Sequence, residues 1–160
     1  MNVFDIFEIN ISGASKLNTK EIFVLSQKME ILCIKNKILS LSAVQVGVNY
    51  NLFVYCLGCY KSYRCMVDCE YKPENQNKFF SIEGCQSVEK NQKRYKVERY
   101  ENVIVEGKEL LINDLKLVDF KKTFSKSMEC CIFQHEIDHY SNISIDKIGK
   151  EIYIHESIKT

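Results

Sequence analysis

The sequence predicts an α+β fold in which mostly antiparallel strands pack around one central helix. Two observations lead to this prediction. Short runs rich in β-branched and aromatic residues occupy the middle of the chain, between residues 52 and 117, and such runs are typical of strands. Segments near each end instead carry helix-starting residues and apolar residues spaced by three and four. With 160 residues, we expect a single domain spanning residues 1–160.

The first helix is predicted to begin after Asn18. Glu21 stands three residues later, which is the spacing of a capping box. An apolar stripe follows at intervals of three and four and predicts a helix to about residue 36, with one face toward the core: Ile22, Leu25, Met29 and Leu32. Residues 1–17 lack clear periodicity, and we expect at most a short strand near residues 9–11.

The middle of the chain predicts strands joined by turns. Residues 52–57 and 63–69 flank Gly58 and are expected to pair. A polar loop holding the only proline is expected at residues 72–78, and an extended segment at residues 79–88. Residues 97–106 and 110–117 flank Gly107, which predicts a second hairpin with its turn at this glycine.

The second helix is predicted to open near Ser125 or Ser127 and to run to about Tyr140. Asn142 lies just past that end, where a left-handed residue commonly terminates a helix. The apolar tail at residues 143–154 is expected to cover one face of the domain.

Composition argues against several classes of protein. The chain has 22 basic and 21 acidic residues and no strong basic run, so a direct nucleic-acid partner is not expected. The first residues carry acids where a signal peptide needs cations, and no apolar run reaches membrane-spanning length. We therefore expect a cytoplasmic protein with no membrane partner, whose eight cysteines are free, metal-bound or catalytic.

The functional residues are expected on the second helix. His135 and His139 are four residues apart, so they project from one face of a helix and can hold one metal ion, with Glu136 beside the first of them. A catalytic metal of this kind needs a third protein ligand and one open position. Cys85 is the best candidate, because it follows Gly84 in a turn of small residues and a thiolate binds zinc or ferrous iron strongly.

Three stretches together resemble the signatures of the peptide deformylase family. Glu83-Gly84-Cys85-x-Ser87 resembles the second signature, and Gln134-His135-Glu136-x-Asp138-His139 resembles the third. The segment ending in Ala43-Val44-Gln45 is similar to the first signature, Gly-x-Gly-Leu-Ala-Ala-x-Gln. Here Ile38 and Ser40 replace the two glycines, and Ser42 replaces an alanine.

The resemblance implies a function and a role for each matching residue. It implies hydrolysis of the N-formyl group from the initiating formylmethionine of nascent polypeptides, with release of formate. Metal ligation would fall to Cys85, His135 and His139, with Fe2+ as the usual ion and Zn2+, Ni2+ or Co2+ also accepted. Glu136 would be the general base and acid. Gln45 and the backbone N–H of Gln86 would stabilise the developing oxyanion.

Residues on the ligand face of the helix are expected to form the pocket for the methionine side chain. Met128, Cys131 and Ile132 lie seven, four and three residues before His135, so they share its face. We also assign Ser40, Leu41 and Glu83 to the substrate-binding cleft. Ser40 is expected to narrow this cleft, because a glycine in its place lets a peptide backbone approach more closely. Arg99 is expected to pair with Glu83 or Asp138.

Other interpretations of the same residues remain. A zinc peptidase of the His-Glu-x-x-His type would take its third ligand downstream, where Glu151, His155 and Glu156 are available. A catalytically impaired relative would only bind formyl-peptide ends. A Cys85 nucleophile with a histidine base is the weakest alternative. Only residues 140–160 follow His139, whereas many bacterial members of the family continue into a longer helix that contacts the ribosome, so we expect ribosome association to be weak.

Overall fold

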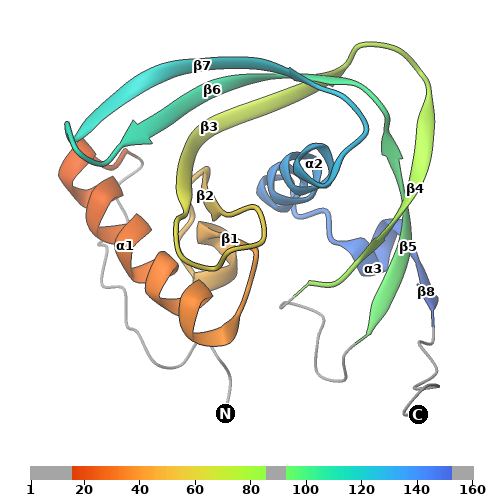
Figure 1. The fold of residues 1–160 in the computed structure, drawn as a ribbon, viewed down its shortest axis with the longest axis horizontal. Coiled ribbons are helices and arrows are strands. Elements are labelled where there is room, and N and C mark those ends of the chain that lie inside the picture. The colour runs from red at the N-terminus through yellow and green to blue at the C-terminus, as the bar shows by residue number, and fades with distance from the viewer. Residues whose placement is uncertain (1–15, 86–92, 153–160) are drawn as a thin grey trace.

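The computed structural model describes residues 16–85 and 93–152 (Figure 1). These residues form two sheets in which all paired strands are antiparallel, one ordered β1-β2-β3-β6-β7 and the other β4-β5-β8. The elements are α1 (Thr19–Asn36), β1 (Ser40–Ser42), the short 3-10 helix η2 (Ala43–Val46), β2 (Leu52–Tyr55), β3 (Arg64–Pro73), β4 (Lys78–Glu83), β5 (Arg94–Tyr100), β6 (Val103–Leu111), β7 (Lys116–Phe124), α2 (Met128–Tyr140), α3 (Ile145–Ile148) and β8 (Lys150–Ile152).

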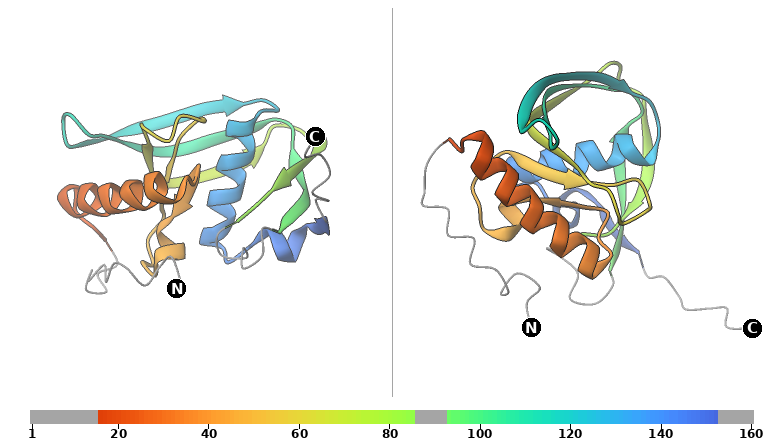
Figure 2. Two further views of the ribbon diagram at one scale, coloured as in Figure 1. Left: turned by 60° about the horizontal axis from the view of Figure 1, so that its bottom comes forward. Right: turned by 60° about the vertical axis from the view of Figure 1, so that its left-hand side comes forward.

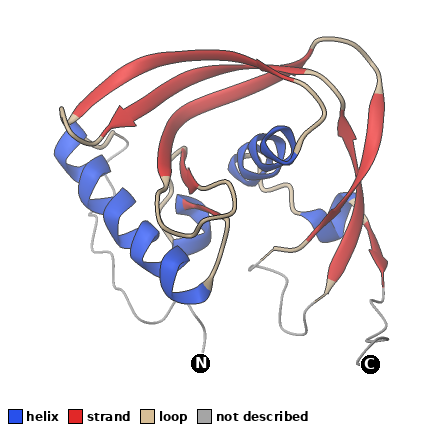
Figure 3. Cartoon of the chain, in the orientation of Figure 1, coloured by secondary structure: helices blue, strands red, loops and turns tan. Residues whose placement is uncertain are grey.

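Helix α2 lies at the centre of the fold. The long strands of the larger sheet curve over it, and β4 and β5 run along its other side (Figures 1 and 3). Helix α1 packs on the outer side of β1 and β2, away from α2 (Figure 2). The prediction of an α+β fold with antiparallel strands around a central helix is therefore confirmed.

Both long helices begin as the sequence predicts. The Asn18 side chain accepts a hydrogen bond from the Glu21 backbone N–H at 3.0 Å, and the Glu21 carboxylate accepts one from the Asn18 N–H at 2.8 Å. Helix α2 is capped by the Ser127 hydroxyl, which accepts from the Cys130 N–H at 3.1 Å. Asn142 follows the end of α2 in the left-handed conformation, with φ 56°. The Asn18 and Ser127 caps satisfy backbone donors that the first turn of a helix otherwise leaves unpaired.

Strand β2 is buried on both faces and lies between the two long helices. Alternate residues of a strand point to opposite sides. Leu52 and Val54 therefore pack into a core with α1, whereas Phe53 and Tyr55 pack into a second core with α2. The Phe133 ring of α2 meets both aromatic rings edge to face, each at a centroid distance of 5.2 Å. The position of α2 relative to β1 and β2 is thus fixed by close packing.

The predicted hairpin around Gly107 is wrong. Gly107 lies inside β6, and the turn between β6 and β7 falls at residues 112–115. A Cβ atom at Gly107 would lie 2.5 Å from the Cys69 Sγ, beside the irregular register between Val67 and Glu70 of β3. The glycine is therefore needed for close approach to a bulge in the neighbouring strand, not for a turn.

Other boundaries differ by smaller amounts. The predicted pairing of residues 52–57 with 63–69 is confirmed as β2 with β3. Strand β3 extends to Pro73, so the polar loop is shorter than predicted. The apolar tail contributes α3 and β8, and β8 pairs with β5. The possible strand at residues 9–11 and the end of the tail lie outside the described residues.

No described helix combines the length and apolar character needed to cross a membrane.

Candidate active site

Cys85, His135 and His139 converge although they come from two distant parts of the chain. Their ligand atoms all lie within 4.8 Å of one another, and the Cys85 Sγ is 3.5 Å from the His139 Nε2. Helix α2 places the two imidazoles one turn apart, with ring centroids separated by 4.9 Å. One sulfur and two imidazole nitrogens at this spacing are a donor set that fits a divalent transition metal.

The four cysteines between residues 56 and 69 do not belong to this cluster. Within residues 16–85 and 93–152, the group of three potential ligands is the one at Cys85, and the thiols of Cys56, Cys65 and Cys69 are buried in the protein core. Cys59 is exposed.

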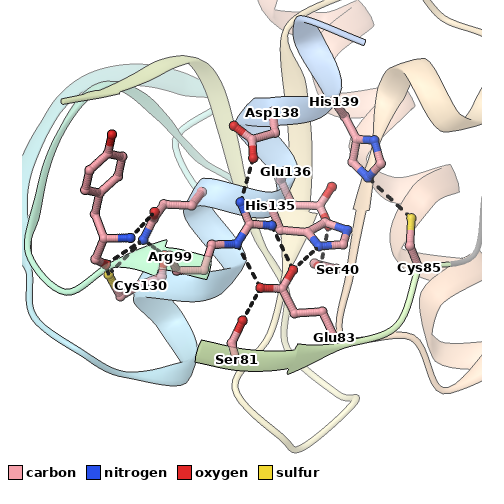
Figure 4. A network of polar contacts seen from close by, with 12 residues as sticks. Ser40, Ser81, Glu83, Cys85, Arg99, Cys130, His135, Glu136, Asp138 and His139 are labelled. Carbon is pink, nitrogen blue, oxygen red and sulfur yellow. Dashed lines mark hydrogen bonds and ion pairs between the residues drawn. The ribbon is translucent and has the colours of Figure 1, made fainter. Parts of the chain in front are cut away.

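Cys85 is positioned by the end of β4. Glu83, the last residue of this strand, pairs in register with Tyr95 of β5. Its carboxylate accepts hydrogen bonds from the Arg99 Nε and Nη2, both at 2.8 Å, and also from the Ser81 hydroxyl. These bonds fix the strand end from which the chain reaches Cys85 two residues later (Figure 4).

Arg99 joins this strand end to α2. Its Nη1 donates to the Asp138 Oδ2 at 2.6 Å, so Arg99 pairs with both carboxylates that the sequence proposed as alternatives. The Tyr71 hydroxyl donates to the other oxygen of Asp138 at 3.0 Å. The Arg99 side chain is 3% exposed. Because a buried charge without an opposite charge destabilises a protein, each charge in this network needs its partner for stability.

Glu83 also orients the first imidazole. Its Oε2 lies 2.8 Å from the His135 Nδ1, which leaves the Nε2 of that ring for a metal ion. Burial alone would raise the pKa of Glu83, but hydrogen bonds from Arg99 and His135 hold it well below its usual range. Burial acts to lower the pKa of His135, yet Cys85 and Glu83 outweigh it and raise that pKa to about 10. Burial, together with His135, lowers the pKa of His139 to about 3.

Replacing Arg99 with methionine is expected to destabilise the protein by about 3–5 kcal/mol, because two buried carboxylates lose their counter-charge. Chemical denaturation at neutral pH measures this loss. The control is Arg64→Met. The Arg64 side chain is 41% exposed in its ion pair with Glu109, so this exchange should lower the free energy of unfolding by only about 1 kcal/mol. Equal losses for the two variants would contradict a structural role for the buried network.

Glu136 is buried beside the ligands. The residue is 1% exposed, and the Ser40 hydroxyl donates to its Oε1 at 2.5 Å. Its Oε2 is buried and has no hydrogen-bond partner among the described residues. Burial raises the pKa of the Glu136 carboxyl above its usual value, although His135 and Ser40 oppose this shift. A carboxyl with a raised pKa is suited to accepting and returning a proton near neutral pH.

Gln45 presents its amide to the same site from η2. Its Oε1 accepts hydrogen bonds from the backbone N–H and the hydroxyl of Ser42, both at 2.9 Å. Its Nε2 donates to the Cys85 Sγ at 3.4 Å. The amide oxygen is therefore held by the chain, and the donor side of the amide is directed toward the ligand group.

A cavity of about 500 Å³ opens beside these groups. Of the residues that the sequence assigns to the site, those lining this cavity are Ser40, Gln45, Glu83, Cys85, Met128, Cys131, Ile132, His135 and Glu136. Leu41 does not line it, because alternation along β1 turns its side chain into the core with α1. His139 belongs to the ligand group, with its Nε2 3.5 Å from the Cys85 Sγ. Gln86 lies outside the described residues.

Several cavity residues were not found from the sequence. Ser81 lines the cavity and donates to Glu83. The period of two along β4 places both on one face, so their spacing was a usable signal. Lys37, Tyr60 and Arg94 also line the cavity, but each comes from a different part of the chain. Nothing in the local sequence indicates that these three residues meet.

Comparisons with known proteins agree on one family. The family profile described as polypeptide deformylase matches residues 8–151. Among solved structures, a peptide deformylase from Legionella pneumophila is 23% identical, with 83% of this chain and 75% of that chain covered and a TM-score of 0.71.

Two further solved structures give similar values. A peptide deformylase from Plasmodium falciparum is 23% identical, covering 84% and 77% of the two chains, with a TM-score of 0.71. A probable peptide deformylase from Synechococcus phage S-SSM7 is 24% identical, covering 83% and 86%, with a TM-score of 0.69. No curated protein sequence matches.

Proposed function

Because the chain belongs to the polypeptide deformylase family, it is a peptide deformylase, and we propose the residues that carry out its reaction. The enzyme hydrolyses the N-formyl group of formylmethionyl peptides. Water adds to the formyl carbon, the carbon–nitrogen bond breaks, and formate and a free α-amine are released. The observation that supports the assignment most strongly is the convergence of Cys85, His135 and His139 beside the buried Glu136.

Cys85, His135 and His139 would hold one divalent metal ion, with ferrous iron as the resident ion and zinc, nickel or cobalt as substitutes. Their donor set of one thiolate and two imidazoles supports this range of ions. When bound, the ion supplies a Lewis acid that polarises the formyl group and acidifies water. Glu83 supports the site by accepting from His135 and fixing that ring's orientation.

Glu136 would act as general base and then as general acid. It would take the proton of the attacking water and return it to the departing amine, which balances the reaction. The Gln45 amide would donate to the oxygen on which negative charge develops, and the Gln86 backbone N–H would be the second donor. Support for Gln45 comes from its amide oxygen, which Ser42 already engages, leaving the donor side toward the ligands.

The methionine side chain would enter the cavity along α2. Ile132 is largely buried there, Cys131 is half-buried, and Met128 is exposed at the start of the helix. Burial raises the pKa of Cys131 to about 11, so its thiol is neutral at pH 7 and suits an apolar pocket. We also propose that the reaction takes place in the cytoplasm, on nascent chains, and that residues 1–160 form one catalytic domain.

Filling this pocket should alter substrate preference. Replacing Cys131 with phenylalanine is expected to lower kcat/KM for formyl-Met-Ala relative to formyl-Ala-Ala by about 10- to 200-fold, because the larger ring takes the space of the substrate side chain. The control, Leu111→Phe, adds the same ring at an exposed position on the β6–β7 hairpin. An unchanged ratio in Cys131→Phe would place the methionine elsewhere.

The function is tested by formate release from formyl-Met-Ala under anaerobic conditions, with metal analysis of the same sample. We expect formate and free amine in equal amounts, together with one metal ion per chain. A chain that carries metal but releases no formate would contradict the assignment and favour the formyl-peptide-binding relative.

The zinc-peptidase alternative has less support. Of its candidate ligands, Glu151 lies in β8 and pairs with Lys93 at 3.1 Å, while His155 and Glu156 lie outside the described residues. The Cys85 Sγ, by contrast, lies within 4.8 Å of a ligand nitrogen of each imidazole.

A further inference from the structure

Ser40 makes a contact that the proposed reaction does not yet use. Its hydroxyl donates to the Glu136 Oε1 at 2.5 Å across 96 residues of sequence. Among the described residues, this hydroxyl is the side-chain partner of the Glu136 carboxylate, because the Oε2 has none. One oxygen of the carboxylate is therefore tied to the protein, and the other is left for the reaction.

The position of this hydroxyl is set by a rigid part of the fold. Ser40 begins β1 and pairs with Tyr55 of β2, a strand buried on both faces. The Leu39 carbonyl just before it accepts from the Cys56 N–H at 2.8 Å. The donor thus belongs to the sheet and the acceptor to α2, so their bond fixes the helix carboxylate relative to β1 (Figure 4).

Ser42 offers a parallel on the same strand. Ser40 and Ser42 are two residues apart, and the Ser42 hydroxyl donates to the Gln45 Oε1 at 2.9 Å. The two serines that depart from the first signature therefore each bind one of the side chains assigned to the reaction. The two serines differ in whether a second donor supports the same bond. The Ser42 backbone N–H donates to the same oxygen of Gln45, whereas among the described side chains only the Ser40 hydroxyl donates to Glu136.

We propose that Ser40 is a positioning residue, whose hydroxyl holds the Glu136 carboxylate so that its Oε2 is presented to the reacting water. This inference rests on the proposed function. It adds a second role to the expectation that Ser40 narrows the cleft, because Ser40 also lines the cavity. A carboxylate held by a donor on a sheet needs no reorientation before it takes a proton, and a misplaced catalytic group costs rate more than substrate affinity.

The test compares Ser40→Ala with Ser40→Thr on the metal-loaded enzyme, with formyl-Met-Ala as substrate. Ser40→Ala is expected to lower kcat about 10- to 100-fold with little change in KM and an unchanged metal content. Ser40→Thr restores a hydroxyl and is expected to recover most of kcat. The control is Ser26→Ala, which removes a buried hydroxyl bonded to the Phe23 carbonyl in α1 and does not line the cavity.

A second measurement tests the contact without using activity. Thermal unfolding of the metal-free Ser40→Ala and Glu136→Ala variants and of the double variant forms a cycle. We expect the double variant to shift the unfolding midpoint by less than the sum of the single shifts, because both remove the same bond. Additive shifts would overturn the inference, as would a raised KM with unchanged kcat in Ser40→Ala. A metal-loaded wild-type chain that releases no formate would instead overturn the proposed function.

Discussion

Exchanging Glu136 for glutamine is expected to lower kcat for formyl-Met-Ala by about 100- to 10,000-fold while the metal ion remains bound. The carboxamide keeps the size of the side chain and can still accept from Ser40, but it cannot take up a proton. The Glu136 carboxyl is almost completely buried, and burial raises its pKa, so a proton it accepts is well retained until the amine departs. Formate release and metal content are measured on the same preparation.

The matched control is Glu129→Gln on the same helix. The Glu129 carboxylate accepts from the Tyr55 hydroxyl at 2.7 Å and does not line the cavity. Its exchange should leave kcat unchanged. A Glu136→Gln enzyme with wild-type kcat would show that another group moves the proton.

Replacing Cys85 with alanine is expected to remove both metal and activity. The two imidazoles of α2 remain, but two ligands hold a catalytic ion much less tightly than three. Metal affinity should fall by more than the roughly 10- to 100-fold that loss of a supporting partner costs. Metal analysis after dialysis, followed by the formate assay, measures the effect.

Cys59→Ala is the control for loss of a thiol, because Cys59 is exposed and belongs to no ligand group in the part of the chain that the structure describes. It should keep metal and activity. The zinc-peptidase alternative makes the opposite prediction to ours: Cys85→Ser would retain the metal and Glu156→Ala would lose it. That result would move the third ligand to the C-terminal tail.

The parts of the site that depend on local spacing were predictable from the sequence. His135 and His139 share a face because any helix repeats after 3.6 residues, and the capping serine fixes where that helix begins. Cys85 differs, since no local rule brings residue 85 next to residue 139. Small residues in a turn and the resemblance to a family are the features that indicate Cys85 as a ligand.

What local patterns miss comes from tertiary contacts. Glycine usually marks a turn, but Gly107 lies inside β6, where it makes room for Cys69 in the neighbouring strand. Ser40 lines the cavity, and its hydroxyl also binds Glu136 across the fold, a contact that no local pattern predicts. In both cases the residue type was informative, but the partner that explains it is far away in sequence.

The division of the proposed ligands between two sides of the fold has a consequence for assembly. Helix α2 can form early from neighbouring residues, but Cys85 and His139 are 54 positions apart, and contacts between such distant residues form slowly. The ion can therefore be captured with all three ligands only after β4 has docked against the helix. Its binding energy would then be added to that late docking step, so a bound metal would stabilise the fully assembled fold.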